Sequence, residues 1–296
     1  MRAVAVLEKP GVAEPRWSAE LLLAEATGKS RAWLYAHPEH TVSARSVARF
    51  KEWLHRRRRH EPVWYILGRA EFYGLEFRVN RHVLIPRNET ELLVETALQM
   101  QAGPLIADIA TGSGCVGICV AKSLPQATVY ATDSSSAALR LAKANAGMRG
   151  VADRVVFLRG DWLEPLPVTV NTIIANPPYV SAEEMKRLPR EVRDYEPREA
   201  LFGGEDGLDG IRAILQEAPR YLLPGGSLLM EISPPRARRT VALARRSFPA
   251  AEIGLLKDYS GRNRVLCVQT HAAGKAKGRE TAVSRPQRRP SSGNLA

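Results

Sequence analysis

The chain lacks the features that mark membrane-spanning, disulfide-bonded and metal-binding proteins. No apolar run reaches the roughly 20 residues that a bilayer requires, and Met1–Pro10 is too charged and too briefly apolar to serve as a signal peptide. Cysteine is scarce: Cys115, Cys119 and Cys267 form an odd set without CxxC spacing, which indicates reduced core thiols in a cytosolic protein. The six histidines show no HExxH or other ligand spacing. We therefore expect no metal site and no membrane partner.

Composition is otherwise that of a globular protein with an excess of positive charge. The 296 residues, 45% hydrophobic and 25% charged, suffice for one large domain and a small one. The net charge is +12, concentrated in His55–His60 and in residues 271–296, where six Lys and Arg face Glu280 alone. This charge fits an acidic or RNA-rich partner, including proximity to ribosomal RNA, and equally fits a solvated helix end with a disordered tail.

The first 90 residues predict helices followed by a β-hairpin. Residues 16–60 are rich in helix formers, with helical runs at 18–26 and 43–60. Apolar residues then alternate over residues 72–86 around Asn80-Arg81, which predicts a hairpin linking two domains. Asn88 and Glu91 have the spacing of a capping box at the start of the next helix.

Residues 105–270 predict an α/β fold in which strands and helices alternate. Such alternation indicates a mainly parallel sheet covered on both faces, a Rossmann-like fold. The expected strands are 105–109, 128–132, 154–158, 172–175, 226–231, 252–256 and 264–269. The expected helices are 114–123, 135–146, 209–222 and 236–247, the first of which places Cys115 and Cys119 on one apolar face.

A glycine-rich loop follows the first of these strands and predicts a nucleotide-type ligand. Glycine lets the backbone turn sharply and lets a ligand lie against the main chain. The loop and its flanks are Asp108, Ala110, Thr111, Gly112, Ser113 and Gly114. Asp133 ends the second strand, where a carboxylate binds a ribose diol, while Asp161 and Trp162 follow the third strand and suit an adenine amino group and ring. These residues alone do not separate NAD from S-adenosylmethionine.

Asn176-Pro177-Pro178-Tyr179 distinguishes these two ligands. Two prolines end the preceding strand and stiffen a turn that brings the Asn176 side-chain oxygen beside the Pro177 carbonyl. Paired acceptors suit a planar NH2 group, against which the Tyr179 ring can lie. The pattern predicts methylation of an amino or amide nitrogen. An enzyme that transfers hydride has no need for paired acceptors that face an NH2 group.

Further segments carry a resemblance to a known family. They are Glu61–Gly68, Glu71–Gly74, Val83–Glu91, the glycine loop, Asn-Pro-Pro-Tyr, Tyr195–Pro197, Ala200–Gly204 and Asp206–Leu208. Over roughly residues 16–270 the chain resembles the protein-(glutamine-N5) methyltransferases that modify peptide chain release factors, the HemK/PrmC family. Asn-Pro-Pro-Tyr is shared with DNA adenine methyltransferases, whereas the Val83–Glu91 segment together with Tyr195–Pro197 is more specific.

The resemblance implies a fold, a substrate and a cofactor. The fold would be a helical N-terminal domain over residues 1–71, a hairpin linker over 72–86, a seven-stranded methyltransferase domain over 87–270 and a disordered basic tail over 271–296. The substrate would be the glutamine of the Gly-Gly-Gln tripeptide of class 1 release factors, and the cofactor S-adenosylmethionine.

The resemblance also implies site residues. It assigns cofactor binding to the glycine loop, Asp133 and Trp162, and substrate binding to Asn176–Tyr179. We expect Asn176, Pro177 and Tyr179 to act in catalysis, with Asn176 also near the cofactor. The chain departs from the family at Ala110, where the family commonly has glycine, at Asn171-Thr172 before the fourth strand, and in its basic tail. It also departs at Ser233-Pro234-Pro235 after Glu231, to which we assign no role.

Other functions stay open at this point. The first is an N-methyltransferase acting on DNA or RNA, which would need a base-flipping pocket and a target-recognition region. Residues 1–85 offer little for that purpose, apart from the arginine run near Trp53. The others are a methyltransferase that acts on a glutamine of a ribosomal protein, a binding module without catalytic activity, and an NAD oxidoreductase.

Overall fold

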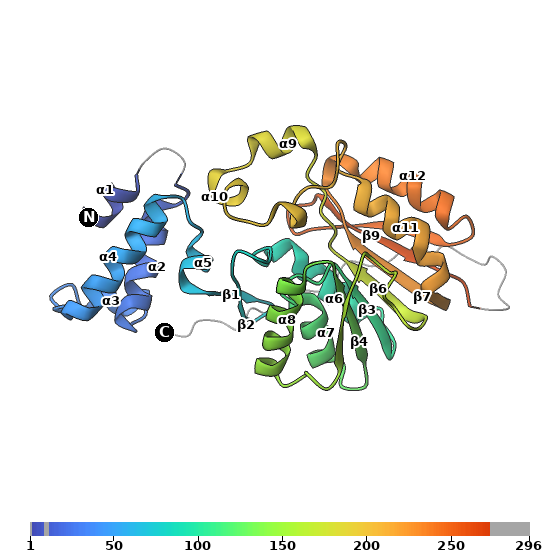
Figure 1. Cartoon of the computed structure of the whole chain (residues 1–296), viewed down its shortest axis with the longest axis horizontal. Coiled ribbons are helices and arrows are strands. Elements are labelled where there is room, and N and C mark those ends of the chain that lie inside the picture. Colours follow the sequence, from blue (N-terminus) through green and yellow to red (C-terminus); the bar gives the residue numbers. More distant parts are fainter. Residues whose placement is uncertain (1, 9–11, 273–296) are drawn as a thin grey trace.

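The N-terminal region forms a small helical unit with its own core. The structure is a computed structural model that describes residues 2–8 and 12–272; residues 273–296, most of the expected tail, lie outside the described residues. Figure 1 shows this unit on one side of the molecule and the large sheet on the other, with a two-stranded hairpin between them. Its helices are α1 (Arg2–Leu7), α2 (Pro15–Thr27), α3 (Arg31–Ala36), α4 (Ala44–Arg58) and α5 (Val63–Leu67). Leu7, Leu22, Leu54 and Ile66 lie in its apolar core.

The hairpin lies earlier in the chain than the sequence predicted. Strands β1 (Arg69–Phe72) and β2 (Leu75–Arg78) pair antiparallel across Tyr73 and Gly74, whose φ angles of 53° and 71° suit a two-residue turn. The predicted turn at Asn80-Arg81 is wrong as a hairpin. Residues 79–86 form no second strand, because the Ile85 N–H donates to Glu196 Oε2 at 3.2 Å instead of to a neighbouring strand.

A seven-stranded sheet of the expected kind forms the large domain. Its strands are β3 (Leu105–Ile109), β4 (Thr128–Asp133), β5 (Val155–Arg159), β6 (Val170–Ala175), β7 (Leu222–Glu231), β8 (Glu252–Lys257) and β9 (Asn263–Gln269). Their order is β5-β4-β3-β6-β7-β9-β8, and β9 runs antiparallel to both of its neighbours. The order reverses between β3 and β6, and the carboxyl ends beside such a point are where open α/β sheets bind ligands.

Helices cover both faces of this sheet. They are α6 (Glu91–Gln99), α7 (Cys115–Ser123), α8 (Ser136–Arg149), α11 (Asp209–Tyr221) and α12 (Ala237–Ser247), with the short α9 (Ala182–Arg187) and α10 (Arg190–Arg193) between β6 and α11. Neighbouring residues of β6 face opposite cores: Ile174 packs with α6 and α7, whereas Ile173 packs with α11 and α12. This alternation is the period of two that a buried strand requires.

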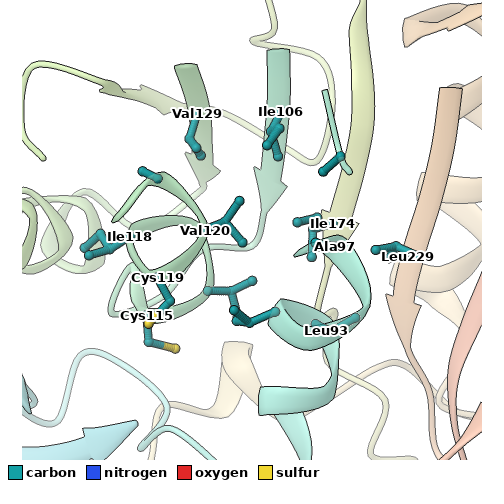
Figure 2. Close-up of a cluster of buried hydrophobic side chains, with 14 of the residues drawn as sticks. Leu93, Ala97, Ile106, Cys115, Ile118, Cys119, Val120, Val129, Ile174 and Leu229 are labelled. Atoms are coloured by element: carbon teal, nitrogen blue, oxygen red, sulfur yellow. The ribbon is translucent and has the colours of Figure 1, made fainter. Parts of the chain in front are cut away.

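The core beneath α6 and α7 also contains two of the cysteines. In Figure 2, Val120 of α7 points toward Ile106 of the sheet, whereas Cys115 and Cys119 lie on the side of α7 away from the strands, within the same buried cluster. Cys115, Cys119 and Cys267 are all buried and unpaired, and burial raises the pKa of the Cys115 and Cys267 thiols to about 12. They are inert core residues at neutral pH, as the sequence predicted.

The predicted capping box is wrong. Asn88–Thr90 forms a short 3-10 helix before α6, without a side-chain cap at its start. The Glu91 carboxylate accepts from the Tyr73 N–H at 2.8 Å instead, which ties α6 to the hairpin turn. The Glu91 carboxylate therefore accepts from the Tyr73 N–H and does not cap the helix.

Candidate functional site

A cleft lies at the carboxyl ends of β3, β4 and β6, beside the reversal in strand order. Its cavity volume is about 130 Å³, and the cleft opens to solvent. Ten of the predicted site residues line it: Asp108, Ala110, Thr111, Gly112, Ser113, Asp133, Asp161, Trp162, Asn176 and Pro178. Gly114, Pro177 and Tyr179 are not among its lining residues.

The glycine loop forms one wall of the cleft and depends on left-handed backbone. Ala110, Gly112 and Gly114 have φ angles of 57°, 55° and 80°. Left-handed backbone costs an alanine about 1–2 kcal/mol. Ala110 adopts this conformation nevertheless, so the loop keeps its shape without a glycine at this position. A Cβ on Gly114 would lie 2.8 Å from Ile118 Cδ1, whereas one on Gly112 would meet no atom within 4 Å. Gly112 thus leaves open space beside the backbone on which a ligand can lie.

Asp133 is held at the loop by two backbone donors. Its Oδ2 accepts from the Gly112 N–H and its Oδ1 from the Ser135 N–H, both at 2.9 Å. Each carboxylate oxygen keeps lone-pair capacity for a further donor. Burial raises the pKa of Asp133 above its ordinary value. The carboxylate is therefore fixed in position and able to accept from two neighbouring hydroxyls.

Asp108 supports the loop from below. It is 3% exposed, and its Oδ2 accepts from the Thr111 hydroxyl and, at 3.0 Å, from the Gly117 N–H. Burial raises its pKa to about 6. Asp108 therefore joins the end of β3 to the first turn of α7.

Asp161 and Trp162 close the side of the cleft beyond Asp133. Trp162 has a φ of 49°, and its carbonyl accepts from the Thr132 hydroxyl at 2.8 Å. Its ring lies against α11, where a Cβ on Gly210 would be 2.6 Å from Cη2. Trp162 is thus both a core aromatic and a wall of the cleft.

The Asn-Pro-Pro-Tyr turn is braced by glycines from a distant segment. A Cβ on Gly203 would lie 2.5 Å from the Pro178 carbonyl oxygen, and one on Gly207 would lie 2.4 Å from the Tyr179 carbonyl oxygen. The Gly203 N–H donates to the Val180 carbonyl at 2.9 Å. Close backbone contact at both glycines holds the turn against residues 201–207.

Asn176 belongs to a buried hydrogen-bond chain that sequence reasoning missed. Its Nδ2 donates to Thr90 Oγ1 at 3.2 Å, and the Thr90 hydroxyl donates to Glu231 Oε2 at 2.7 Å. The Tyr179 hydroxyl donates to Glu231 Oε1 at 3.0 Å, so this ring is attached to Glu231 rather than lining the cleft. Glu231 ends β7, and a carboxylate at the carboxyl end of a parallel strand was the signal that could have found it.

A second missed group joins the cleft to the N-terminal unit. The Glu196 carboxylate accepts from the Ile85 N–H and forms an ion pair with Arg87, which lines the cleft beside Pro197 and Glu199. The Tyr195 hydroxyl donates to the Arg59 carbonyl at 2.7 Å. Residues 195–199 therefore connect the rim of the cleft to the end of α4.

The described part of the chain offers neither a metal-ligand cluster nor a membrane-spanning helix. Within residues 2–8 and 12–272, no group of three or more His, Cys, Asp or Glu side chains is placed to hold a metal ion. No helix in that described part is both long and apolar enough to cross a bilayer.

Comparison with protein families matches both parts of the chain. The family described as "PrmC N-terminal domain" matches residues 1–68. The family described as "Methyltransferase small domain" matches residues 88–191. The two matches flank the β1–β2 hairpin, and the second includes the glycine loop and Asn-Pro-Pro-Tyr.

Individual relatives cover most of the chain. A release factor glutamine methyltransferase of Rhodopirellula baltica is 39% identical over 270 residues, which is 88% of this chain and 91% of the relative. One of Moorella thermoacetica is 42% identical over 267 residues, 88% of this chain and 94% of the relative. A methyltransferase structure from Pyrococcus furiosus has a TM-score of 0.52 at 16% identity, covering 68% of this chain and 91% of that one. This last similarity shows the fold alone.

Proposed function

The chain belongs to the release factor glutamine methyltransferase family, and we propose that it methylates the side-chain N5 of the Gly-Gly-Gln glutamine of class 1 release factors with S-adenosylmethionine. The observation that carries this proposal is the position of Asn176 in the same cleft as the glycine loop and Asp133. A site for a nucleotide-type cofactor beside an Asn side chain whose oxygen can accept from an NH2 group suits transfer of a methyl group to nitrogen.

The residues of the cleft fit S-adenosylmethionine. Ala110–Gly114 offers backbone beside open space, Asp133 offers two acceptor oxygens for a ribose diol, and Asp161 and Trp162 suit an adenine. When bound, this cofactor supplies a methyl carbon made electrophilic by a positive sulfur.

The Asn-Pro-Pro-Tyr turn holds the substrate amide. An amide nitrogen is a poor nucleophile because its lone pair is delocalised into the carbonyl. We assign one amide hydrogen to the Asn176 Oδ1 and the other to the carbonyl of Pro177, which follows Asn176 although it is not itself among the lining residues. No donor within residues 2–8 and 12–272 competes for either oxygen. These hydrogen bonds strengthen as positive charge develops on the nitrogen, and the proton leaves to water afterwards. Orientation of this kind is worth about 7–11 kcal/mol.

The rest of the molecule serves substrate recognition. We assign recognition to the helical unit that precedes the β1–β2 hairpin, so the segment that joins it to residues 87–270 begins at Arg69 rather than at residue 72. Three buried, unpaired cysteines suit the reducing cytoplasm, which is where we place the reaction.

The test is methyl transfer from tritiated S-adenosylmethionine to purified release factor, followed by peptide mapping. Label is expected on the Gly-Gly-Gln glutamine, and it should disappear when that glutamine is changed to asparagine. Label only on added DNA or RNA, or on a ribosomal protein, would overturn the proposed substrate.

Asn176→Ala separately tests the two acceptor oxygens, Asn176 Oδ1 and the Pro177 carbonyl, which together we call the clamp. Loss of one transition-state acceptor lowers single-turnover transfer by about 10²–10³-fold, while cofactor affinity stays near wild type. Asn263→Ala, at the start of β9 and not among the residues lining the cleft, is the control and keeps the wild-type rate. Wild-type transfer by Asn176→Ala would remove Asn176 from the mechanism.

A further inference from the structure

We propose that Thr90 and Glu231 are positioning residues whose hydrogen-bond chain fixes which end of the Asn176 carboxamide faces the substrate. This inference rests on the proposed function and adds two residues to it. Neither has a role in the clamp as described above, and Glu231 is not among the residues that line the cleft. It acts on the reaction through Thr90 and Tyr179.

Three segments far apart in sequence bring the chain together. Asn176 follows β6, Thr90 ends the 3-10 helix before α6, and Glu231 ends β7. Thr90 lines the cleft but is only 3% exposed, and Glu231 is 1% exposed, so little water reaches their hydrogen bonds. Buried polar groups in such a chain must pair with one another, because an unsatisfied one costs about 1–3 kcal/mol.

The direction of the chain follows from the number of hydrogens. Burial raises the pKa of Glu231, but hydrogen bonds from the Thr90 and Tyr179 hydroxyls oppose that rise and favour the carboxylate. A carboxylate can only accept, so the single hydroxyl hydrogen of Thr90 goes to Glu231 Oε2. Thr90 Oγ1 is then left as an acceptor, which the Asn176 Nδ2 fills at 3.2 Å. The Asn176 Oδ1 is thereby directed away from Thr90 and is available to the substrate amide.

A reversed carboxamide would defeat the clamp. If Asn176 turned its Nδ2 toward the cleft, two NH2 groups would face each other, one from Asn176 and one from the substrate. Its Oδ1 would then face Thr90 Oγ1, whose hydrogen is already donated to Glu231. The reversed arrangement leaves donors opposed on one side and acceptors opposed on the other.

Glu231 also fixes the other end of the turn. The Tyr179 hydroxyl donates to its Oε1 at 3.0 Å, and burial raises the Tyr179 pKa, so the hydroxyl stays protonated and remains a donor. One carboxylate thus sets the direction at Asn176 and the position of Tyr179. In a buried chain, each hydrogen bond also polarises the next, which makes the Asn176 Oδ1 a better acceptor as charge develops.

The test compares Thr90→Val with Thr90→Ser. Valine keeps the shape of threonine and removes the hydroxyl, so single-turnover transfer is expected to fall about 10–100-fold, as expected for loss of a buried hydrogen-bond partner. Serine keeps the hydroxyl and restores the rate to within about threefold. The dissociation constant for S-adenosylmethionine stays within about twofold in both variants. Equal rates for the two variants would overturn the proposal.

Thr96→Val is the matched control for loss of a buried threonine hydroxyl. Thr96 is 1% exposed and donates to the Leu92 carbonyl at 2.6 Å, away from the cleft. Its substitution is expected to leave the rate of transfer unchanged. A loss equal to that of Thr90→Val would show that the effect is one of general packing and would overturn the proposal.

A double-mutant cycle separates this proposal from the clamp itself. If Thr90 acts through Asn176, adding Thr90→Val to Asn176→Ala lowers the rate no further, whereas an unrelated role would make the losses multiply. Glu231→Gln is expected to behave as Thr90→Val, because a neutral amide no longer dictates the direction of the Thr90 hydroxyl. Wild-type transfer by Asn176→Ala would refute the clamp. A slow Asn176→Ala with wild-type rates for Thr90→Val and Glu231→Gln would refute the positioning role alone.

Discussion

The two halves of the cleft are built over very different distances in sequence. On the side proposed to bind the cofactor, the hydrogen bonds of Asp108 and Asp133 to the glycine loop and α7 join residues 3, 9 and 21 positions apart. Those of Thr132 to Trp162 and of Asn145 to Ser113 join residues 30 and 32 positions apart. On the substrate side, they join residues 86 positions apart at Asn176 and Thr90, and 141 apart at Thr90 and Glu231. The cofactor half is a local supersecondary unit, whereas the substrate half exists only once the whole chain has folded.

The difference extends to the N-terminal unit. Arg57 of α4, 3% exposed, donates to Glu191 Oε2 of α10 at 2.6 Å, to Ser18 Oγ, and to the Ala13 and Glu61 carbonyls. Glu191 belongs to the segment that continues through Glu196 to the rim of the cleft. Buried side chains therefore join the N-terminal unit to the rim of the cleft on the side proposed to bind the substrate.

The largest effect is expected from Arg57→Ala. Removal of one member of a buried ion pair costs about 3–5 kcal/mol, because its partners are left unsatisfied. We expect a lower free energy of unfolding in urea and a higher KM for release factor. The dissociation constant for S-adenosylmethionine should stay within about twofold of wild type, because no cofactor-side contact involves α4.

Arg56→Ala is the control for this change. Arg56 lies next in the chain and pairs with Glu61 at 2.6 Å, but the two side chains are 34% and 21% exposed. Exposed pairs contribute less than about 1 kcal/mol, so both stability and KM should change little. If Arg57→Ala weakened cofactor binding as much as release factor binding, the two halves would not be separable.

The same contrast explains what the sequence could predict. Strand β3, the glycine loop and Asp133 are local patterns, and the predicted boundaries of the strands agree with the structure to within four residues. The roles of Thr90 and Glu231 depend on side chains 141 positions apart, which no local pattern encodes. The hairpin was misplaced for a related reason: Ile85, in the alternating pattern, donates to Glu196, which lies 111 positions later.

Other errors arose where a local pattern was overridden. Asn88 and Glu91 have capping-box spacing, but the Tyr73 N–H takes the Glu91 carboxylate. Helices α9 and α10 were not predicted, since each spans six residues or fewer and too few turns show a helical period. The family resemblance, carried by several short segments together, was confirmed by the relatives where the single patterns failed.

A smaller effect, confined to the cofactor half, is expected from Asp108→Asn and depends on pH. Burial raises the pKa of Asp108 to about 6, against about 3.9 in the unfolded chain. Between these values the folded state holds more protons than the unfolded state, so the contribution of Asp108 to stability falls as pH rises from about 4 to 6. The shift corresponds to about 3 kcal/mol at most. Asparagine does not titrate, and its oxygen can accept from Thr111 and Gly117 in the same place.

Urea unfolding of both proteins from pH 4 to 7 measures this effect. The difference in unfolding free energy between wild type and Asp108→Asn should shift in favour of the variant as pH rises, while effects of other titrating groups cancel. A difference that stays constant with pH would mean that Asp108 does not titrate in this range. The KM for release factor should be unchanged, because Asp108 supports only the cofactor side.

The smallest effect is expected from Gly117→Ala, which tests how tightly the local unit is packed. A Cβ on Gly117 would lie 2.7 Å from Asp108 Oδ2 and 3.1 Å from Val129 Cγ1. Overpacking costs about 1–3 kcal/mol, more than the helix propensity of about 1 kcal/mol that alanine adds, so we expect net destabilisation and weaker cofactor binding. Gly147→Ala in α8 meets no atom within 4 Å and should stabilise by about 0.5–1 kcal/mol. Changes of opposite sign in the free energy of unfolding would show that close packing of Asp108 against α7 outweighs helix propensity at Gly117. Changes of the same sign would contradict this.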